Sequence, residues 1–439
     1  MNIGLFSDSY FPEIHGVASS IQTLRDELEK KGHHVYVFTS ARPDATKTAG
    51  IFRLPSMPFV FLPSMRFAIF YTLRAAKSVK RVQLDIIHTQ TEFSLGIFGK
   101  LMAFSLQIPV VHTYHTMYKD YAHYVTKGHF VRQSNDMVKV LTRAYCSGCR
   151  MIIAPTQKVA QLLKEYSIKR PIRVIPSGIK LDRFMEAAVQ ADNRLVISNE
   201  FNLKPNQPII LYIGRVAKEK SIDVILHALP DVLRKLPNCV FLVIGNGPEK
   251  ETLQQLVISL HIENSVLFAG SRPWVSTPKY YAAADVFVSA SKTETQGLTI
   301  LEAMASGTPV LARNDLSFSE MVSHRKSGLL FDDSDTLAAQ LIEVLSDKEL
   351  SAELTKNARK TVQSYSAEVF GERVEALYKE AISLPLMKSD IHSYRIVGRV
   401  NKIRNKMLDS VQKQFQFNKK QLDQMRKKVH SFASKIRRL

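Results

Sequence analysis

Glu294, Gly297 and Glu302 lie in a stretch, 294–309, whose residue types suit a ligand that carries both hydroxyl groups and negative charge. A carboxylate can accept hydrogen bonds from two hydroxyls at once, so each glutamate suits a vicinal diol. Gly297 lets the backbone come close to a ligand and leaves amides free to bind an anion. The stretch therefore predicts a site for a nucleotide sugar. The alternative is a first-turn charge at Glu294 and a solvated helix residue at Glu302.

The elements around this stretch must present it at the edge of a sheet. Residues 284–290 and 310–312 are short apolar runs typical of buried strands, and 298–305 predicts a helix between them. Gly307 and Pro309 end that helix, since Gly suits the C-terminal turn and Pro cannot continue it. The order strand, polar loop, helix, strand is that of a parallel sheet, whose ligands bind outside the carboxyl ends of its strands.

A candidate anion site follows another predicted strand, 209–214. Arg215, Lys218 and Lys220 come directly after it and before a predicted helix at 222–229. Arginine can bind a phosphate through two N–H groups, whereas lysine supplies a point charge. A glycine and cations after a strand end therefore predict phosphate binding, with solvated loop charges as the alternative.

The N-terminal half also begins like a Rossmann fold. Residues 3–6 and 34–38 predict strands around a helix at 18–31, although the G-x-G-x-x-G fingerprint of dinucleotide-binding proteins is absent. His115 follows a further predicted strand, 110–112, and so lies where a parallel sheet places its ligands. On the residues alone, a lone histidine is more often structural.

Glu294, the seven residues after it, Glu302 and the run AMASGTPV that follows resemble the signature of the retaining glycosyltransferases of family four. The resemblance implies an α/β protein of GT-B fold, with two Rossmann-like domains facing a cleft. It also implies a nucleotide-sugar donor. Residues 271–274 lie where family members hold the nucleotide base through backbone groups.

The resemblance implies roles for individual residues. Arg215 and Lys220 would offset charge on the leaving diphosphate, Glu294 would hold the sugar, Glu302 the ribose, and His115 the sugar edge near the reaction centre. The predicted catalytic residues are His115, Glu294, Arg215 and Lys220. The predicted donor-binding residues are Gly16, Arg215, Lys220, Glu294, Gly297 and Glu302. Family members often have a glycine pair where this chain has His15 and Gly16. Because no Asp-x-Asp motif accompanies the nucleotide region, we expect no metal and no other cofactor.

The stretches 87–96 and 112–121, with the N-terminal run FSDSYFPEIHGVASSIQTL, narrow the resemblance to the bacterial diacylglycerol glucosyltransferases. It then implies transfer of glucose from UDP-glucose to diacylglycerol, at the cytoplasmic face of the cell membrane, by a peripheral protein. Three alternatives remain. The enzyme could use another UDP-sugar or an already glycosylated lipid, it could be a nucleotide-sugar epimerase, or it could be a basic membrane- or nucleic-acid-binding protein without transfer activity.

Residues 59–81 predict contact with a lipid surface. Residues 59–63 would expose apolar side chains if they form a loop, and 65–81 carries five cations and no acid beside an aromatic face. A basic amphipathic helix of this kind lies in the interface of an anionic membrane, although a helix with its aromatic face in the core is the alternative. The predicted membrane-binding residues are Phe59, Phe61, Leu62, Arg66, Phe67, Phe70, Arg74, Lys77, Lys80 and Arg81.

The 439 residues provide two Rossmann-like domains and a tail. We expect an N-terminal acceptor- and membrane-facing domain at 1–180, a nucleotide-sugar-binding domain at 181–365, a helix crossing back to the first domain at 366–387, and a basic tail at 388–439. Residues 185–207 are polar and irregular in pattern, which predicts either a linker or the start of the second domain. The three cysteines indicate a reducing compartment, and the C-x-x-C pair at 146 and 149 is interpreted as structural.

The net charge of +20 is concentrated in the tail, where 388–439 holds 15 Lys and Arg against 3 Asp. Apolar residues recur there every three or four positions from Ile396 onward, with one gap of seven, which predicts an amphipathic helix. Such a helix suits anionic lipid, with nucleic acid and a coiled coil as alternatives. We expect lipid rather than nucleic acid, because no base-stacking or groove-reading motif accompanies it. No stretch approaches the length of a membrane span, and the N-terminus predicts a strand rather than a signal peptide.

Overall fold

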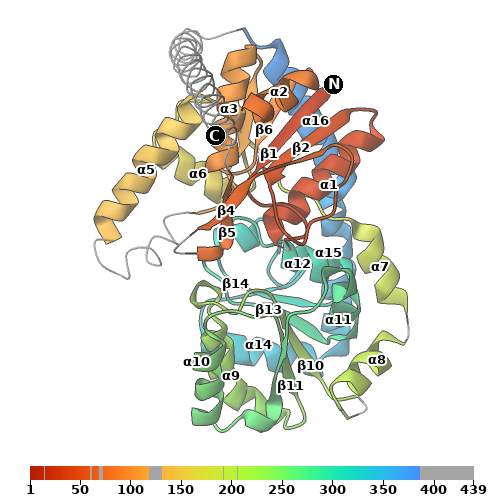
Figure 1. Ribbon diagram of the computed structural model, residues 1–439. Helices are drawn as coiled ribbons and strands as arrows, with labels where there is room; N and C mark the ends of the chain where they lie inside the picture. Colours follow the sequence, from red (N-terminus) through yellow and green to blue (C-terminus); the bar gives the residue numbers. More distant parts are fainter. Residues whose placement is uncertain are drawn as a thin grey trace, which may run out of the picture. The chain divides into compact units, whose positions relative to one another are not determined.

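The computed structural model describes residues 1–13, 15–59, 62–68, 73–117, 131–190, 192–204 and 206–385. Two parallel sheets, one from each half of the chain, dominate the architecture (Figure 1). The predicted tail, 388–439, lies outside the described residues. No helix within these ranges is long and apolar enough to cross a bilayer.

The first sheet has the strand order β3-β2-β1-β6-β7-β8-β9, and all its neighbours are parallel. Its strands are β1 (Asn2–Ser7), β2 (His34–Ser40), β3 (Ile51–Leu54), β6 (Ile86–Thr89), β7 (Val110–Thr113), β8 (Met151–Ala154) and β9 (Ile172–Val174). Among the described residues, the helices of this half are α1 (Gly16–Lys30), α2 (Leu73–Arg81), α3 (Ser94–Leu106), α5 (Val131–Ser147) and α6 (Gln157–Glu165). The predicted strands at 3–6, 34–38 and 110–112 are confirmed.

The second sheet has the order β12-β11-β10-β13-β14-β15 and is also parallel throughout. Its strands are β10 (Ile209–Ile213), β11 (Val240–Ile244), β12 (Val266–Gly270), β13 (Val286–Ser289), β14 (Val310–Arg313) and β15 (Leu329–Phe331). Its connections include η1 (Lys218–Lys220), α9 (Ile222–Lys235), α10 (Lys250–Ser259), η2 (Glu263–Ser265), η3 (Trp274–Ser276), α11 (Thr277–Ala283), α12 (Leu298–Ala305), α13 (Leu316–Ser319), α14 (Ser334–Ser346), α15 (Lys348–Val362) and η4 (Gln363–Tyr365).

Successive residues of β10 explain why its sequence is apolar without a break. Ile210 and Tyr212 are buried in the hydrophobic cluster on one face of the sheet, and Ile209 and Leu211 in the cluster on the other. A parallel sheet covered on both faces needs such continuous apolar strands. The predicted strand, helix and strand around 294–309 are confirmed as β13, α12 and β14.

The predicted amphipathic helix at 65–81 is wrong over its first part. Residues there belong to an antiparallel hairpin of β4 (Ser56–Phe59) and β5 (Leu62–Ala68), and α2 begins only at Leu73. The Arg66 side chain folds back onto the partner strand, with Nε 2.9 Å from Ser56 Oγ and Nη2 3.0 Å from Ser56 O. Pairing with β4, which lies earlier in the chain, overrides the local helical period.

The segment 185–207 is not irregular over most of its length, so the linker interpretation is wrong there. It contains the end of α7 (Leu181–Val189) and all of α8 (Asn193–Glu200). Phe184 and Ile197 are buried in a core cluster of the second sheet. The apolar residues of α7 recur every three positions and face that core, which stabilises the helix.

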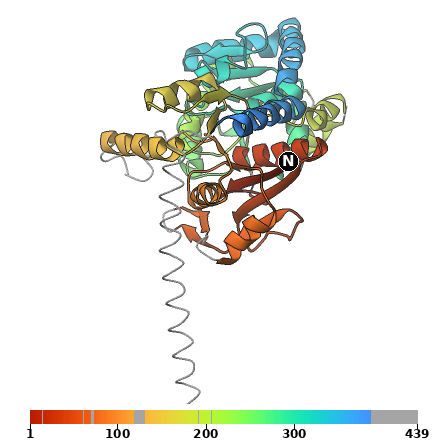
Figure 2. The same ribbon diagram turned by 90° about the horizontal axis from the view of Figure 1, so that it is seen from above.

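The helix α16 (Ala367–Ser383) contributes to the core of the first sheet, although it follows the second sheet in the chain. Phe370, Val374 and Leu377 are buried in the cluster that contains Ile3 of β1. Figures 1 and 2 both show this blue helix beside the red α1, from the opposite end of the sequence. Its Tyr378 hydroxyl lies 2.6 Å from His88 Nδ1, at the centre of the first sheet.

Candidate active site

The loop between β13 and α12 is held in one conformation by contacts to the first half of the chain. The buried Gln296 side chain donates to Ser177 O at 2.9 Å and accepts from Ser177 N at 2.8 Å. The Thr156 hydroxyl donates to Thr295 O at 2.8 Å. These bonds fix the segment that carries Glu294 and Gly297 against residues of the first half of the chain.

Gly297 begins α12 in a conformation that favours glycine. Its φ is +86°, and a Cβ placed on it would lie 2.5 Å from Cε1 of the buried Phe318. Gly16, at the start of α1, lies nearby, because a Cβ placed there would be 3.7 Å from Cδ1 of Leu298. The glycine loop of the first half and the first residue of α12 therefore come together.

Glu294 and Lys220 form an ion pair. Lys220 Nζ lies 2.5 Å from Glu294 Oε1, and the side chains are only 18% and 21% exposed. Burial alone would raise the pKa of Glu294, but the charge and hydrogen bond of Lys220 outweigh it and hold the pKa below its ordinary value. The two residues follow β10 and β13, which are neighbours in the sheet, so the topology brings together an acid and a cation far apart in sequence.

Arg215 lies in the same loop as Lys220 but is more accessible. Its side chain is 52% exposed, and Nη1 lies 4.0 Å from Oε1 of the buried Glu219. The Tyr212 hydroxyl donates to Arg215 O at 2.9 Å and fixes the backbone. The guanidinium therefore remains accessible to an anionic ligand beside the Lys220–Glu294 pair.

Glu302 lies on α12 and is not a solvated helix residue. The Tyr281 hydroxyl donates to its Oε2 at 2.8 Å, and its side chain is half-buried. Burial raises the pKa of Glu302 to about 7, partly offset by the Tyr281 hydroxyl, the charge of Arg183 and the Trp274 side chain. These three partners, from α11, α7 and η3, escaped the sequence analysis because nothing in their spacing connects them to position 302.

His115 follows β7 and is neutral at physiological pH. Its Nε2 lies 2.7 Å from Oε1 of Gln90, and burial, together with His112 and His15, lowers its pKa to about 3. Because Nε2 faces a carbonyl oxygen, it carries the proton, and Nδ1 is a hydrogen-bond acceptor. This neutral imidazole can position a sugar hydroxyl, but it cannot supply positive charge.

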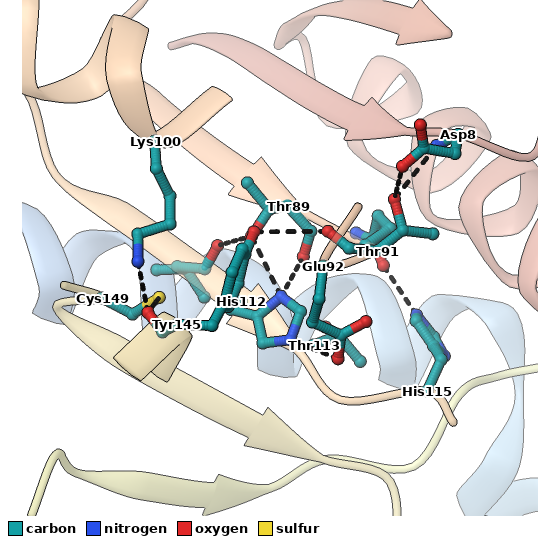
Figure 3. Close-up of polar contacts among 12 residues, drawn as sticks. Asp8, Thr89, Thr91, Glu92, Lys100, His112, Thr113, His115, Tyr145 and Cys149 are labelled. Atoms are coloured by element: carbon teal, nitrogen blue, oxygen red, sulfur yellow. Dashed lines mark hydrogen bonds and ion pairs between the residues drawn. The ribbon is translucent and has the colours of Figure 1, made fainter. Parts of the chain in front are cut away.

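A layer of polar contacts supports His115 at the carboxyl ends of β1, β6 and β7 (Figure 3). Asp8 accepts hydrogen bonds from the Thr91 hydroxyl at 2.7 Å, from Leu95 N at 3.1 Å and from the Ser94 hydroxyl, and burial raises its pKa. It thereby holds the turn after β6 that carries Gln90. The sequence analysis missed Asp8, although an acid directly after a strand was a signal that could have found it.

His112 extends the same layer beneath the site. Its Nε2 lies 3.1 Å from Glu92 Oε1 and its Nδ1 lies 3.0 Å from the Thr89 hydroxyl. His112 itself is fully buried. These contacts indicate a structural role for His112 in the core. His115, by contrast, is half-buried and can be reached by a ligand.

The predicted membrane-binding residues divide into three groups. Arg74, Lys77, Lys80 and Arg81 are exposed on α2, whose Ala75 and Val79 are buried. Arg66 is engaged by Ser56 as described above. Phe61 and Phe70 lie outside the described residues, as do the side chains of Phe59, Leu62 and Phe67, whose backbones form the hairpin.

Helix α5 carries an exposed apolar surface that the sequence analysis did not identify. Met137, Val140 and Leu141 are 60%, 59% and 60% exposed and follow one another at helical spacing. Figure 1 shows α5 extending away from the first sheet, while its last residues, including Cys146, are buried. A stripe of three large apolar side chains on one helix is a candidate contact surface.

Metal binding finds no support in the part of the chain that the structure describes. No group of three or more His, Cys, Asp or Glu side chains lies close enough there to hold a metal ion. The expectation of a metal-independent reaction stays a prediction.

Comparison with known proteins matches both halves of the chain. The family model described as Glycosyltransferase Family 4 matches residues 14–183, and the one described as Glycosyl transferases group 1 matches 193–361. An alpha-monoglucosyldiacylglycerol synthase of Streptococcus pneumoniae is 40% identical over 407 residues, 91% of each chain. The chain belongs to glycosyltransferase family four. A synthase of the same name from Acholeplasma laidlawii is 33% identical and spans 87% of this chain and 98% of that protein.

Solved structures place this family-four protein in the GT-B fold. Anabaena HepE, determined in complex with UDP and glucose, has a TM-score of 0.69 at 18% identity and covers 87% of this chain and 100% of its own. WaaG, a glycosyltransferase of lipopolysaccharide biosynthesis, has a TM-score of 0.66 at 17% identity and covers 86% and 99%. The predicted fold class is confirmed.

Proposed function

We propose that this glycosyltransferase moves glucose from UDP-glucose to 1,2-diacylglycerol at the membrane surface and makes alpha-monoglucosyldiacylglycerol with retention of anomeric configuration. The observation that carries the proposal is the 40% identity to a synthase of that product over 91% of both chains. A UDP-sugar donor is supported by HepE, whose structure holds UDP and glucose.

The ion pair of Lys220 with Glu294 supplies the charged groups that would bind the donor. Arriving phosphates compete with Glu294 for Lys220, while the accessible Arg215 supplies a second cation. As the bond between sugar and diphosphate breaks, negative charge grows on the leaving oxygens, and fixed cations in a half-buried site stabilise it. Glu294, released from Lys220, is then able to accept hydrogen bonds from the sugar hydroxyls.

Gly297 and His115 position the sugar in this proposal. The amides at the start of α12 are available to the diphosphate, because Gly297 places no side chain over them. The neutral His115 offers Nδ1 to a sugar hydroxyl, held in orientation by its bond to Gln90. Glu302 takes the ribose, as the family resemblance implies.

Membrane contact would come from two described surfaces. The exposed cations Arg74, Lys77, Lys80 and Arg81 of α2 suit an anionic leaflet, where each is worth about 1 kcal/mol. The apolar stripe of α5 is bordered by Lys139 and by the exposed Arg143. Because the proposed acceptor is a lipid, we infer that the bilayer covers this stripe and that the enzyme is peripheral to the cytoplasmic face.

The deciding experiment incubates the protein with vesicles of anionic lipid and diacylglycerol and with a panel of UDP-sugars, and identifies the lipid products and their anomeric configuration. We expect α-glucosyldiacylglycerol from UDP-glucose, with activity unchanged by EDTA. A different sugar in the product would identify another donor, and product formed only from glycolipid would identify a later step.

The same assay separates the proposal from proteins of other classes. Conversion of the UDP-sugar without lipid would identify an epimerase. Vesicle or RNA binding without release of UDP would identify a binding protein and refute the transfer reaction.

A further inference from the structure

Lys158, in the first turn of α6, contacts the loop that carries Glu294. Its Nζ donates to Lys292 O at 3.0 Å and to the two carboxylate oxygens of Asp315 at 2.7 and 2.9 Å. The side chains of Lys158 and Asp315 are only 15% and 18% exposed. An ammonium group has three N–H donors, so these contacts use its whole donor capacity on the second half of the chain. The arrangement differs from a solvated surface ion pair, which contributes little.

Asp315 joins Lys158 to the backbone of Glu294. It is the N-cap of α13, and its Oδ1 accepts from Ser317 N at 2.9 Å. The Ser317 hydroxyl donates in turn to Glu294 O at 2.6 Å, and Ser317 is fully buried. The carbonyl oxygens of Lys292 and Glu294 are therefore both held by a set of hydrogen bonds that includes Lys158.

The start of α6 is also fixed to the second half of the chain by its backbone. Glu320, which follows α13, accepts from Gln157 N at 2.9 Å and from Lys158 N at 3.2 Å. Thr156, the N-cap of α6, donates its hydroxyl hydrogen to Thr295 O at 2.8 Å. The backbone of Lys158 is thus anchored beside the loop that its side chain contacts.

We propose that Lys158 is a positioning residue for Glu294, because it holds the loop in the conformation that presents the Glu294 carboxylate to the sugar of the donor. The inference rests on the proposed function, which gives Glu294 to the sugar. UDP has no sugar, so Lys158 acts on recognition of the glucosyl group and not on recognition of UDP. The sugar subsite, carried by the second half of the chain, is complete only while α6 of the first half contacts it.

Lys158→Met keeps an unbranched apolar stem and removes the charge and the three hydrogen bonds. We expect kcat/KM for UDP-glucose to fall about 10- to 100-fold, because a loosely held loop no longer places Glu294 on the sugar. The Kd of UDP-glucose should rise, whereas the Kd of UDP should not change. Lys158→Arg keeps the charge and can still bind Asp315, so it should restore part of the lost activity.

The test measures two Kd values of the full-length protein, for UDP-glucose and for UDP, by isothermal titration calorimetry, together with transfer to diacylglycerol in vesicles. The ratio of the Kd values separates positioning from stability, because a role in stability alone lowers the fraction of active protein and leaves the ratio unchanged. Lys164→Met is the matched control, since Lys164 is exposed on the same helix, and it should match wild type.

Ser317→Ala provides a second test if Lys158→Met does not fold. It removes the hydrogen bond to Glu294 O, so it should raise the ratio of the two Kd values in the same direction. Ser319→Ala, exposed on the same helix, is its control. An unchanged ratio in Lys158→Met, or in Ser317→Ala where Lys158→Met does not fold, overturns the inference and leaves the proposed function intact. An equal change in the matched control overturns it as well. Wild-type protein that binds no UDP-glucose overturns the donor assignment and the inference together.

Discussion

Replacing Gly297 by alanine tests the geometry of the loop that carries the proposed donor site. The residue has a φ of +86°, and a Cβ there would lie 2.5 Å from Phe318 Cε1. Phe318 is fully buried, so its ring cannot move without disturbing the core. Gly270 is a matched control, because its φ is +72° but a Cβ there meets no atom within 4 Å.

The two glycines separate the backbone cost from the steric cost. The left-handed conformation costs an alanine about 1 to 2 kcal/mol at either position. Overpacking against Phe318 adds about 1 to 3 kcal/mol at position 297 alone. Gly297→Ala should therefore lower the free energy of unfolding by about 2 to 5 kcal/mol, and Gly270→Ala by about 1 to 2 kcal/mol.

Urea denaturation followed by far-ultraviolet circular dichroism measures both values, and calorimetry with UDP measures the effect of Gly297→Ala on the site. We expect weaker UDP binding, because the start of α12 has to shift away from Phe318. The cost of alanine at 297 should shrink in a Phe318→Leu background, where the ring edge is gone. Equal losses of stability in the two single variants would refute the steric argument.

Three further predictions concern the site and the apolar surface of α5. Arg215→Ala should lower kcat by roughly 100- to 1,000-fold and leave vesicle binding unchanged, because its side chain is 52% exposed and supports no core; normal turnover would contradict its phosphate role. Glu302 has a folded-state pKa of about 7 against an ordinary value of 4.5, so folding takes up a proton and the free energy of unfolding should rise as pH falls from about 7 to 4.5. Glu302→Gln should remove most of this pH-dependent increase in the free energy of unfolding, which is less than about 3 kcal/mol. Urea titrations at several pH values measure it, and an equal pH dependence in wild type and variant would contradict the assignment. Val140→Asp and Leu141→Asp should each weaken vesicle binding roughly ten- to hundred-fold, because the transfer energy of the apolar contacts is lost; sedimentation with vesicles measures this. The matched control is Leu195→Asp on α8, whose side chain is 61% exposed, and an equal loss of binding in that control would exclude a specific α5 surface.

Local patterns in the sequence determined the elements of the second sheet that carry the proposed donor site. The strands β10 and β13 are apolar without interruption because both faces of the sheet are covered, and glycine and proline mark where α12 ends. A parallel sheet puts its loops at the carboxyl ends of its strands, so the topology implied by these patterns already placed Glu294 and Lys220 at one edge.

Tertiary structure alone decided which side chains meet at that edge. Three contacts each join residues from separate elements: the ion pair of Lys220 with Glu294, the hydrogen bond of Tyr281 to Glu302, and the hydrogen bond between Gln90 and His115. It also decided that residues 65–68 form a strand rather than a helix, since pairing with β4 outweighs their helical spacing. The periodicity of a sequence records which face of an element is buried, whereas the order of the strands and the packing of distant helices select the partners of each polar group.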